Sequence, residues 1–224
     1  MKNLLEDKTL RNRAFVFEDR VDAGRQLSLL LSEFKSANAI VLAIPSGGVP
    51  VGIEIRKRWG FPFDLLIVRK VQIPWNTEAG FGAVNLDGEK VLNEELLHSI
   101  RLPEDVILAQ IEKTREILKS REAMFRRRKP FPDLKHKVAI LVDDGLASGF
   151  SMMAGIHFVK KRDPSKIVIA VPTASYNTLL RISPLVDALY CLNVREGYPY
   201  AVAAAYRSWH DLDEKEVLEL LDQI

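Results

Sequence analysis

Two adjacent carboxylates and a stretch of small residues stand together in one short segment. Asp143 and Asp144 follow an apolar run at 138–142, and most residues of 145–151 are small or carry a hydroxyl. Carboxylates at a strand end can accept hydrogen bonds from sugar hydroxyls or contact a hard cation. Small residues that lead into a helix let backbone N–H groups converge on an anion. Acids followed by such a phosphate cradle indicate a sugar phosphate as the ligand.

Two more polar groups follow apolar runs. The Ser46-Gly47-Gly48 turn comes after residues 39–44, and Arg69 and Lys70 come after residues 64–68. Open parallel sheets bind ligands at the carboxyl ends of their strands, so we expect all three groups to meet at one edge. A Walker motif requires a lysine after its last glycine, whereas Phe150 follows Gly149, and no strand–helix turn carries G-x-G-x-x-G.

The pattern of apolar runs predicts the elements that position these groups. Strands are predicted at 39–44, 64–68, 138–142, 166–171 and 186–192, and helices at 17–31, 50–59, 104–128, 151–161 and 176–182, with a further amphipathic helix in the tail. Asp87-Gly88 predicts a hairpin turn between 81–86 and 89–92. The fold class is therefore α/β: a Rossmann-like, mostly parallel sheet flanked by helices, with a loop and hairpin excursion at 71–92.

Composition narrows the classes of function. The chain has 224 residues, 47% of them hydrophobic and 28% charged, with a net charge of +2. This balance makes nucleic acid an unfavoured partner. One cysteine allows no intrachain disulfide, and four scattered histidines argue against a zinc hydrolase. No apolar run approaches the ~20 residues of a membrane span, and the first residues are too charged for a signal peptide, so we expect a cytoplasmic protein with no membrane partner.

The segment 138–151 resembles the phosphoribosyl diphosphate (PRPP) motif of the type I phosphoribosyltransferases. The segments at 17–24, 45–51, 68–70, 81–84 and 91–95 look like a branch of that family whose substrate is uncharacterised. The match runs from about Phe17 into the tail. It implies a single domain over residues 1–224, with a core at about 37–192, a small hood built from about 1–20 and 193–224, and a mobile loop and hairpin at about 71–92.

The resemblance also implies a role for each matching position. Asp143 and Asp144 would hold the ribose hydroxyls, and the 5-phosphate would lie on Gly145, Leu146, Ala147, Ser148, Gly149, Phe150 and Ser151. Ser46, Gly47, Gly48, Arg69 and Lys70 would bind the diphosphate, in a loop that often contains a non-proline cis peptide. Asp144 and Lys70 are the candidate catalytic residues. Phe17 and Tyr198 are candidates for contact with the acceptor.

The implied activity is transfer of the 5-phosphoribosyl group from PRPP to a nitrogen acceptor, nucleobase-like in character, with release of diphosphate. Mg²⁺ would be bound mainly by the substrate, with Asp143 and Asp144 as candidate contacts, and a homodimer is expected. A PRPP-sensing regulator without catalysis is the alternative on the same fold, and an enzyme acting on another phosphorylated sugar is a third.

The sequence departs from the family at several positions. Ser46 stands where this branch often has arginine, and Ser148 and Ser151 stand where threonine is common. Ala147 replaces a second aspartate that is typical of 6-oxopurine transferases, which argues against hypoxanthine–guanine chemistry.

Overall fold

The centre of the molecule is a six-stranded parallel sheet. The computed structural model describes residues 1–127, 129–197 and 199–224, the side chains of residues 77 and 78 excepted. The strand order is β1-β9-β8-β7-β2-β3, and every neighbouring pair is parallel. The bounds are β1 (Leu4–Glu6), β2 (Ala39–Ala43), β3 (Phe63–Leu65), β7 (Val138–Val142), β8 (Lys166–Ser175) and β9 (Ala188–Arg195). The predicted parallel sheet is confirmed.

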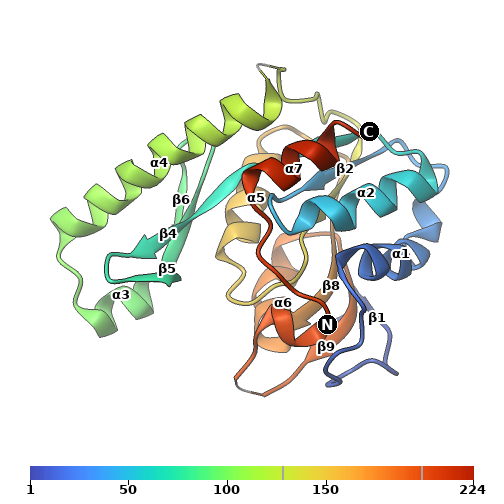
Figure 1. Ribbon diagram of the computed structural model, residues 1–224, viewed down its shortest axis with the longest axis horizontal. Coiled ribbons are helices and arrows are strands. Elements are labelled where there is room, and N and C mark those ends of the chain that lie inside the picture. The colour runs from blue at the N-terminus through green and yellow to red at the C-terminus, as the bar shows by residue number, and fades with distance from the viewer. Residues whose placement is uncertain (128, 198) are drawn as a thin grey trace.

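Helices cover both faces of this sheet (Figure 1). Alternate residues of β2 face opposite sides, so Leu42 packs with residues of α5 (Phe150–Lys160) and α6 (Tyr176–Ile182). Val41 packs with residues of α1 (Arg20–Leu30) and α2 (Gly48–Trp59). Burial on both faces explains why the strands read as continuous apolar runs. Gly60 ends α2 in the left-handed conformation, at φ 69°, as the sequence predicts.

A second, smaller sheet projects from the main body (Figure 1). It is antiparallel and consists of β4 (Val68–Ile73), β5 (Asn76–Asn85) and β6 (Lys90–Leu92). The helices α3 (Glu94–Ile100) and α4 (Glu104–Arg126) follow it in the chain, and α4 packs along β4 and β5. The predicted turn at Asp87-Gly88 is confirmed, with the Gly88 N–H donating to the Asn85 carbonyl at 2.9 Å.

Two expectations for this region are wrong. The run 64–68 is not one strand, because β3 ends at Leu65 and β4 begins a new sheet at Val68. Leu66 and Ile67 are buried in two different clusters, so the apolar run continues across the change of sheet. Within the expected loop and hairpin at 71–92, the hairpin is confirmed by the pairing of β5 with β6, whereas the expected loop before it is mostly strand, at 71–73 and 76–80. Register shifts on either side of Gln72 break the alternation that would have revealed it.

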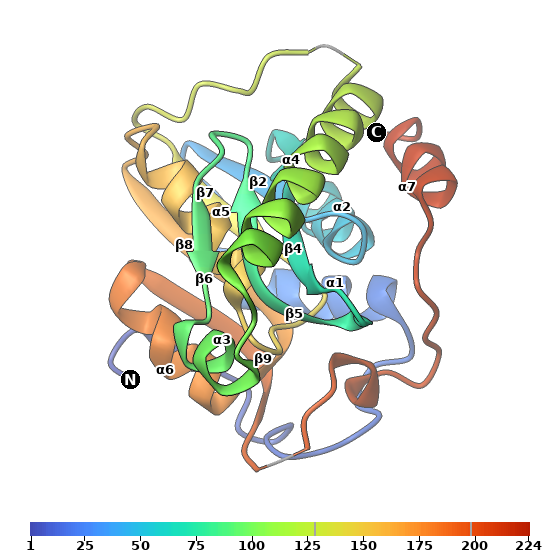
Figure 2. The same cartoon turned by 90° about the vertical axis from the view of Figure 1, so that its left-hand side faces the viewer.

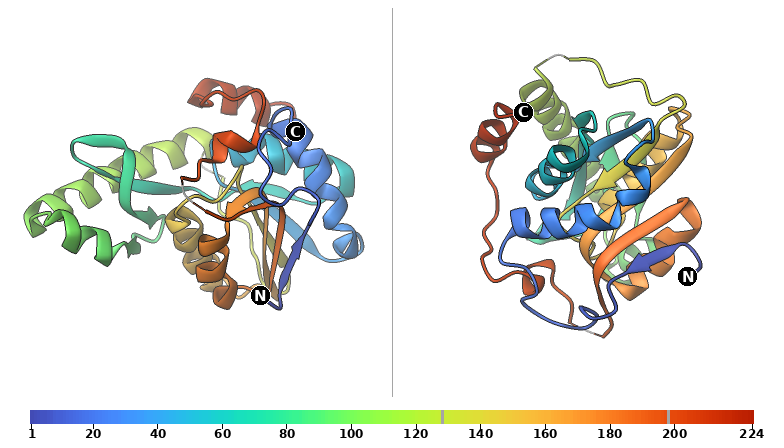
Figure 3. Two further views of the ribbon diagram at one scale, coloured as in Figure 1. Left: turned by 90° about the horizontal axis from the view of Figure 1, so that it is seen from below. Right: turned by 90° about the vertical axis from the view of Figure 1, so that its right-hand side faces the viewer.

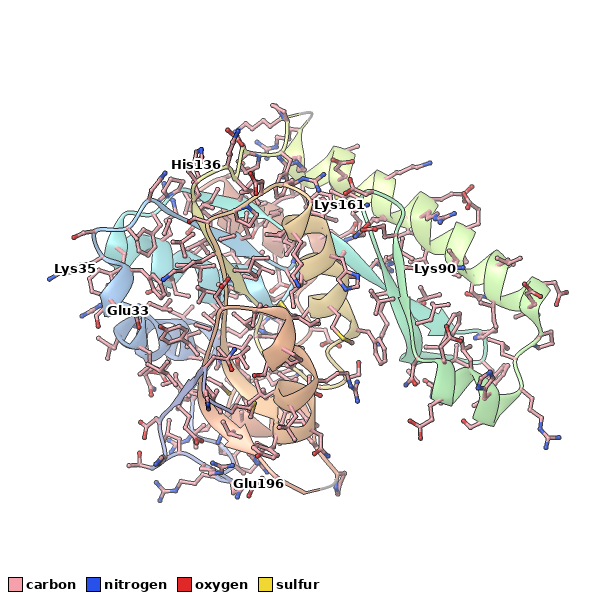
Figure 4. All side chains as sticks on the ribbon, turned by 180° about the vertical axis from the view of Figure 1, so that it is seen from behind. Glu33, Lys35, Lys90, His136, Lys161 and Glu196 are labelled. Atoms are coloured by element: carbon pink, nitrogen blue, oxygen red, sulfur yellow. The ribbon has the colours of Figure 1, made fainter. Side chains whose placement is uncertain are left out.

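Ion pairs connect the turn between β5 and β6 to the residues that follow α5. Lys161, just beyond α5, lies 2.8 Å from Glu89 (Figure 4). Arg162 binds both carboxylate oxygens of Asp87, at 3.0 and 2.9 Å. Figure 4 shows the sheet and α4 extending away from this attachment.

The terminal segments have three parts. β1 pairs with β9 at the edge of the main sheet, so residues 4–6 belong to that sheet (Figure 3). The segment 7–19 runs together with residues 196–197 and 199–209, since the Phe15 N–H donates to the Ala204 carbonyl and Arg11 pairs with Glu196 at 2.6 Å. α7 (Glu214–Leu221) lies beside the C-terminal half of α4 (Figure 2). Within the described ranges, no helix is long and apolar enough to cross a membrane.

Candidate functional site

The turn after β2 is packed directly against the two acids after β7. The Pro45–Ser46 peptide bond is cis, and α2 begins at Gly48. A Cβ atom on Gly47 would lie 1.9 Å from Oδ2 of Asp144, and one on Gly48 would lie 2.6 Å from the Val142 carbonyl oxygen. Both positions therefore accommodate only glycine without displacement of the neighbouring loop. The parallel pairing of β2 with β7 brings the two turns together, as predicted.

The two acids have different surroundings. Asp143 Oδ1 accepts a hydrogen bond from the Asp144 N–H at 2.9 Å. Burial and then the nearby Asp144 charge raise the pKa of Asp143 well above its usual range. Burial also raises the pKa of Asp144, against the opposing effect of the Arg20 guanidinium. Two carboxyl groups are thus held together with one cation bound to them, and this arrangement suits ligands that bring hydrogen-bond donors or a cation.

Arg20 is a site residue to which the sequence analysis gave no role. Its Nε donates to Asp144 Oδ2 at 2.8 Å, and its Nη1 donates to the His210 carbonyl at 2.8 Å. The guanidinium lies 3.8 Å from the centroid of the Trp209 ring. These contacts bury the side chain and fix one oxygen of Asp144. The only signal in the sequence was the position of Arg20 within the family-like segment 17–24.

The loop 145–149 is arranged to present backbone N–H groups. Thr178 donates through its hydroxyl to the Ala147 carbonyl, and Arg181 donates to the Ser148 carbonyl at 3.1 Å, so α6 engages the oxygens of this loop. Among the described residues, none accepts a hydrogen bond from the N–H groups of Ala147, Ser148 or Gly149. Gly149 has φ 79° and is the N-cap of α5. Amides without acceptors at a helix N-terminus are suited to an anion.

Two residues of this loop contribute through the backbone alone. Leu146 and Phe150 are buried in the core beneath the loop. The Leu146 N–H donates to the Thr173 carbonyl, and its carbonyl accepts from the Ser175 N–H, which holds the loop against β8.

The predicted end of β8 at Pro172 is wrong. β8 continues to Ser175, because beyond Ala170 it pairs only with β9 and the missing proline N–H is tolerated.

A cleft of about 250 Å³ brings the predicted charged groups together. Asp143 and Ser151 line it from the main sheet, and Arg69 and Lys70 line it from β4. Pro45 of the cis turn and Gln72 complete these walls. The cleft therefore joins an acid from the ribose-type site with two cations from the predicted diphosphate site.

Arg121 of α4 also lines this cleft. Its Nη2 donates to the Ser46 hydroxyl oxygen at 3.2 Å. The sequence offered no signal for this contact, because α4 carries five lysines and arginines that no local pattern tells apart, and the two residues lie 75 positions apart.

Neither of the two residues expected to contact the acceptor is found on an exposed surface of the described structure. Tyr198 lies outside the described residues. Phe17 is fully buried and packs on Tyr206, with ring centroids 5.6 Å apart. Tyr206 in turn donates to the Asp144 carbonyl at 2.5 Å, so this aromatic pair supports the acidic loop from below. Phe17 therefore presents no surface to an acceptor.

The side chains of the site suit a metal ion that is bound mainly by the substrate and only in part by the protein. In the part of the chain that the structure describes, no cluster of three or more metal-ligating side chains occurs. Asp143 lines the cleft, while Asp144 already has Arg20 as a partner. Mg²⁺ commonly uses one or two carboxylates together with phosphate oxygens and water, which matches this donor set.

Comparison with known proteins agrees with this fold. The family model for the phosphoribosyl transferase domain matches residues 21–191. A Mycobacterium tuberculosis protein named "Putative phosphoribosyl transferase" is 34% identical over 208 residues, which are 93% of this chain and 47% of that protein. The chain thus spans about half the length of its curated relative. The crystal structure of TT1426 from Thermus thermophilus superposes with a TM-score of 0.73 at 32% identity, covering 92% of this chain and 98% of the other.

The chain belongs to the phosphoribosyl transferase domain family, and its fold is the type I phosphoribosyltransferase fold.

Proposed function

We propose that the protein transfers the 5-phosphoribosyl group of PRPP to a nitrogen of a small, nucleobase-like acceptor and releases diphosphate. One observation carries the proposal: the Gly47 turn lies against Asp144, so a diphosphate-type turn and a ribose-type acid pair form one continuous surface. The cleft that extends from it is lined by Arg69 and Lys70. A ribose with a phosphate at one end and a diphosphate at the other matches this order of groups.

Each part of PRPP has a proposed partner. Asp143 and Asp144 accept hydrogen bonds from the ribose hydroxyls, and Arg20 keeps Asp144 oriented for that task. The open amides of 147–149, with the Ser148 and Ser151 hydroxyls, bind the 5-phosphate. Backbone donors of the turn 46–48, with Arg69 and Lys70, bind the diphosphate. The segments 7–19 and 199–209 form the side from which the acceptor enters, and the small sheet closes over the opposite side.

The proposed reaction is a displacement at the anomeric carbon. The C1–O bond to diphosphate breaks and its electron pair goes to the leaving group, while the acceptor nitrogen uses its lone pair to form C1–N. The nitrogen loses its proton to solvent or to the departing diphosphate. Lys70 and Arg69 stabilise the charge that develops on diphosphate as the bond breaks, and the protein otherwise contributes positioning.

Mg²⁺, when bound, neutralises part of the diphosphate charge. Asp143 is the side chain best placed to contact it directly or through water, because that carboxylate lines the cleft.

Two measurements test this function. Calorimetric titration with PRPP in the presence of Mg²⁺ is expected to show binding, and a screen of nucleobases and amines is expected to show acceptor-dependent release of diphosphate. Replacement of Asp144 by Asn is expected to weaken PRPP binding by about 1–3 kcal/mol, the scale of a hydrogen bond to a charged group. Exposed Asp211→Asn is the matched control.

The outcomes separate the alternatives. If millimolar PRPP gives no binding, both transfer and PRPP sensing are rejected. If PRPP binds but no acceptor in a broad screen releases diphosphate, a PRPP-sensing regulator replaces the enzyme as the better account.

A further inference from the structure

Arg121 of α4 is a nearly buried cation at the edge of the cleft. Its side chain is 13% exposed, and its guanidinium lies 5.1 Å from the centroid of the Phe125 ring. Nη2 donates to the Ser46 hydroxyl at 3.2 Å, so the cation is held at the cis turn that precedes α2. α4 runs across the small sheet, and Figure 2 shows its C-terminal half beside α7.

The hydrogen-bonding capacity of Arg121 is only partly used. Nε lies 3.3 Å from Glu214 Oε1, but this ion pair is not aligned as a hydrogen bond, and in the described part of the chain Nε has no hydrogen-bond partner. A guanidinium offers five N–H donors in a planar fork that matches phosphate oxygens. A buried donor without an acceptor is costly, and an anion in the cleft would relieve that cost.

The surroundings of Arg121 are also electrostatically crowded. Burial and then the charge of Arg69 lower the pKa of Arg121, while Glu214 opposes them. Lys70 lines the same cleft. Like charges held around a small cavity repel one another until an anion enters, so this arrangement favours a ligand with several negative charges.

Glu214 is positioned by the start of α7. It is the first residue of that helix, and its side chain is 46% exposed. Asp213 and Glu216 form a capping box, with hydrogen bonds of 2.8 and 2.9 Å, that fixes where the helix begins. Val217 is fully buried and anchors the helix. Because Glu214 is half exposed, its carboxylate can turn into water while Arg121 and α7 stay in place.

We propose that Arg121 binds the diphosphate group of PRPP, and that Glu214 is a resting counter-ion which the diphosphate displaces. This inference rests on the proposed function and adds a residue of α4 to the proposed diphosphate site. Arg121 is a binding residue for the leaving group, and Glu214 sets how tightly that group is held. Affinity for PRPP thus includes the cost of separating Arg121 from Glu214.

The first test compares three ligands by calorimetry in the presence of Mg²⁺: PRPP, diphosphate and ribose 5-phosphate. Arg121→Gln is expected to weaken binding of PRPP and of diphosphate by about 10-fold or more, and to leave binding of ribose 5-phosphate unchanged. The matched control is Arg127→Gln, which removes an ion pair between the C-terminal ends of α4 and α7, that of Arg127 with Asp222 at 2.7 Å. The control is expected to bind all three ligands as the unaltered protein does.

The second test is Glu214→Gln, at a half-exposed position where folding is expected to be preserved. Removal of the competing carboxylate is expected to tighten PRPP and diphosphate binding several-fold, whereas Asp222→Asn is expected to change neither. Unchanged or weaker binding in Glu214→Gln would overturn the role of Glu214 as a competitor.

The ligand series distinguishes failure of this inference from failure of the proposed function. If the unaltered protein binds neither PRPP nor ribose 5-phosphate, the proposed function fails. If it binds PRPP and Arg121→Gln binds PRPP equally well, only the inference fails. A loss of ribose 5-phosphate affinity in Arg121→Gln together with PRPP affinity would mean that the residue supports the fold of the site, and it would also overturn the inference.

Discussion

Arg20 Nε lies 2.8 Å from Asp144 Oδ2, so the first residue of α1 holds an acid that follows β7, 124 positions later in the chain. The side chains are 8% and 14% exposed. Tyr206 binds the carbonyl of the same aspartate. The acid pair is thus fixed from both terminal segments, and this arrangement connects the stability of the fold with the geometry of the proposed ribose site.

Replacement of Arg20 by Gln is expected to destabilise the protein strongly. Removing one partner of a buried ion pair leaves an uncompensated charge, which typically costs about 3–5 kcal/mol. The free energy of unfolding from urea titration measures this. Arg25→Gln on the same helix is the control, because Arg25 is 69% exposed and its partner Glu54 keeps Lys57; about 0–1 kcal/mol is expected there. Equal losses in both variants would mean that Asp144 does not depend on Arg20.

Replacement of Gly47 by Ala is expected to cost about 1–3 kcal/mol of unfolding free energy, the usual scale for overpacking. The new Cβ would lie 1.9 Å from Oδ2 and 2.4 Å from Cγ of Asp144, so the carboxylate must move. In an Asp144→Ala background those atoms are gone, and the same glycine replacement is expected to cost much less. If the cost is the same in both backgrounds, the close approach of the two loops is not its cause.

The acid pair is expected to make stability depend on pH. The pKa of Asp143 is raised by burial and by Asp144, and the pKa of Asp144 is raised by burial. A carboxyl with a raised folded pKa contributes stability below its unfolded pKa of about 3.9 and loses it as pH rises through the folded pKa. At neutral pH, where these carboxyls are ionised in the unfolded chain, the raised pKa values in the folded state therefore reduce the free energy of unfolding. Asp143→Asn keeps an acceptor for the Asp144 N–H and removes one charge.

The expected result is a higher Tm for Asp143→Asn at pH 7.5, by roughly 2–4 °C for each kcal/mol gained. This gain is expected to shrink as the pH falls below the unfolded pKa of about 3.9, because the acids are then increasingly protonated in both states. Thermal unfolding across that range, with exposed Asp211→Asn as the control, measures the difference. A lower Tm for Asp143→Asn at neutral pH would contradict the assignment.

The sequence predicted those parts of the site that are local in the chain. A buried strand, two acids and a run of small residues are contiguous, so the loop 143–151 was recognisable from the local order of its residues. Its meeting with the Ser46 turn followed from the rule that parallel strands share an edge. The core strands were predictable for the same reason, because burial on both faces leaves an apolar run.

The contacts that fix the site were not predictable, because they join residues far apart in the chain. Arg20 with Asp144 and Arg121 with Ser46 depend on where α1 and α4 pack, and no local pattern distinguishes these arginines from exposed ones. The hairpin of β5 and β6 was predicted, but its extension into a three-stranded sheet with β4 was missed because register shifts on either side of Gln72 hide the alternation. Sequence patterns indicate burial and local geometry, whereas ion pairs between distant elements depend on tertiary packing.

Thr178→Val is expected to weaken binding of the 5-phosphate without a comparable effect on folding. The Thr178 hydroxyl donates to the Ala147 carbonyl and so helps to orient the amides of the loop 145–149. Valine keeps the shape and removes that donor, at a cost of about 0.5–1.5 kcal/mol in ribose 5-phosphate affinity, or roughly 2- to 12-fold. Calorimetry with ribose 5-phosphate is the measurement.

Thr114→Val is the matched control for this change. Thr114 is also a buried threonine, and its hydroxyl donates to the Gln110 carbonyl within α4, away from the loop. Both variants are expected to fold, and only Thr178→Val is expected to bind ribose 5-phosphate more weakly. If the two variants bind it equally well, the loop does not need the contact from α6 to hold a phosphate, and the open amides of 147–149 are set by Gly149 and the Leu146 pairing alone.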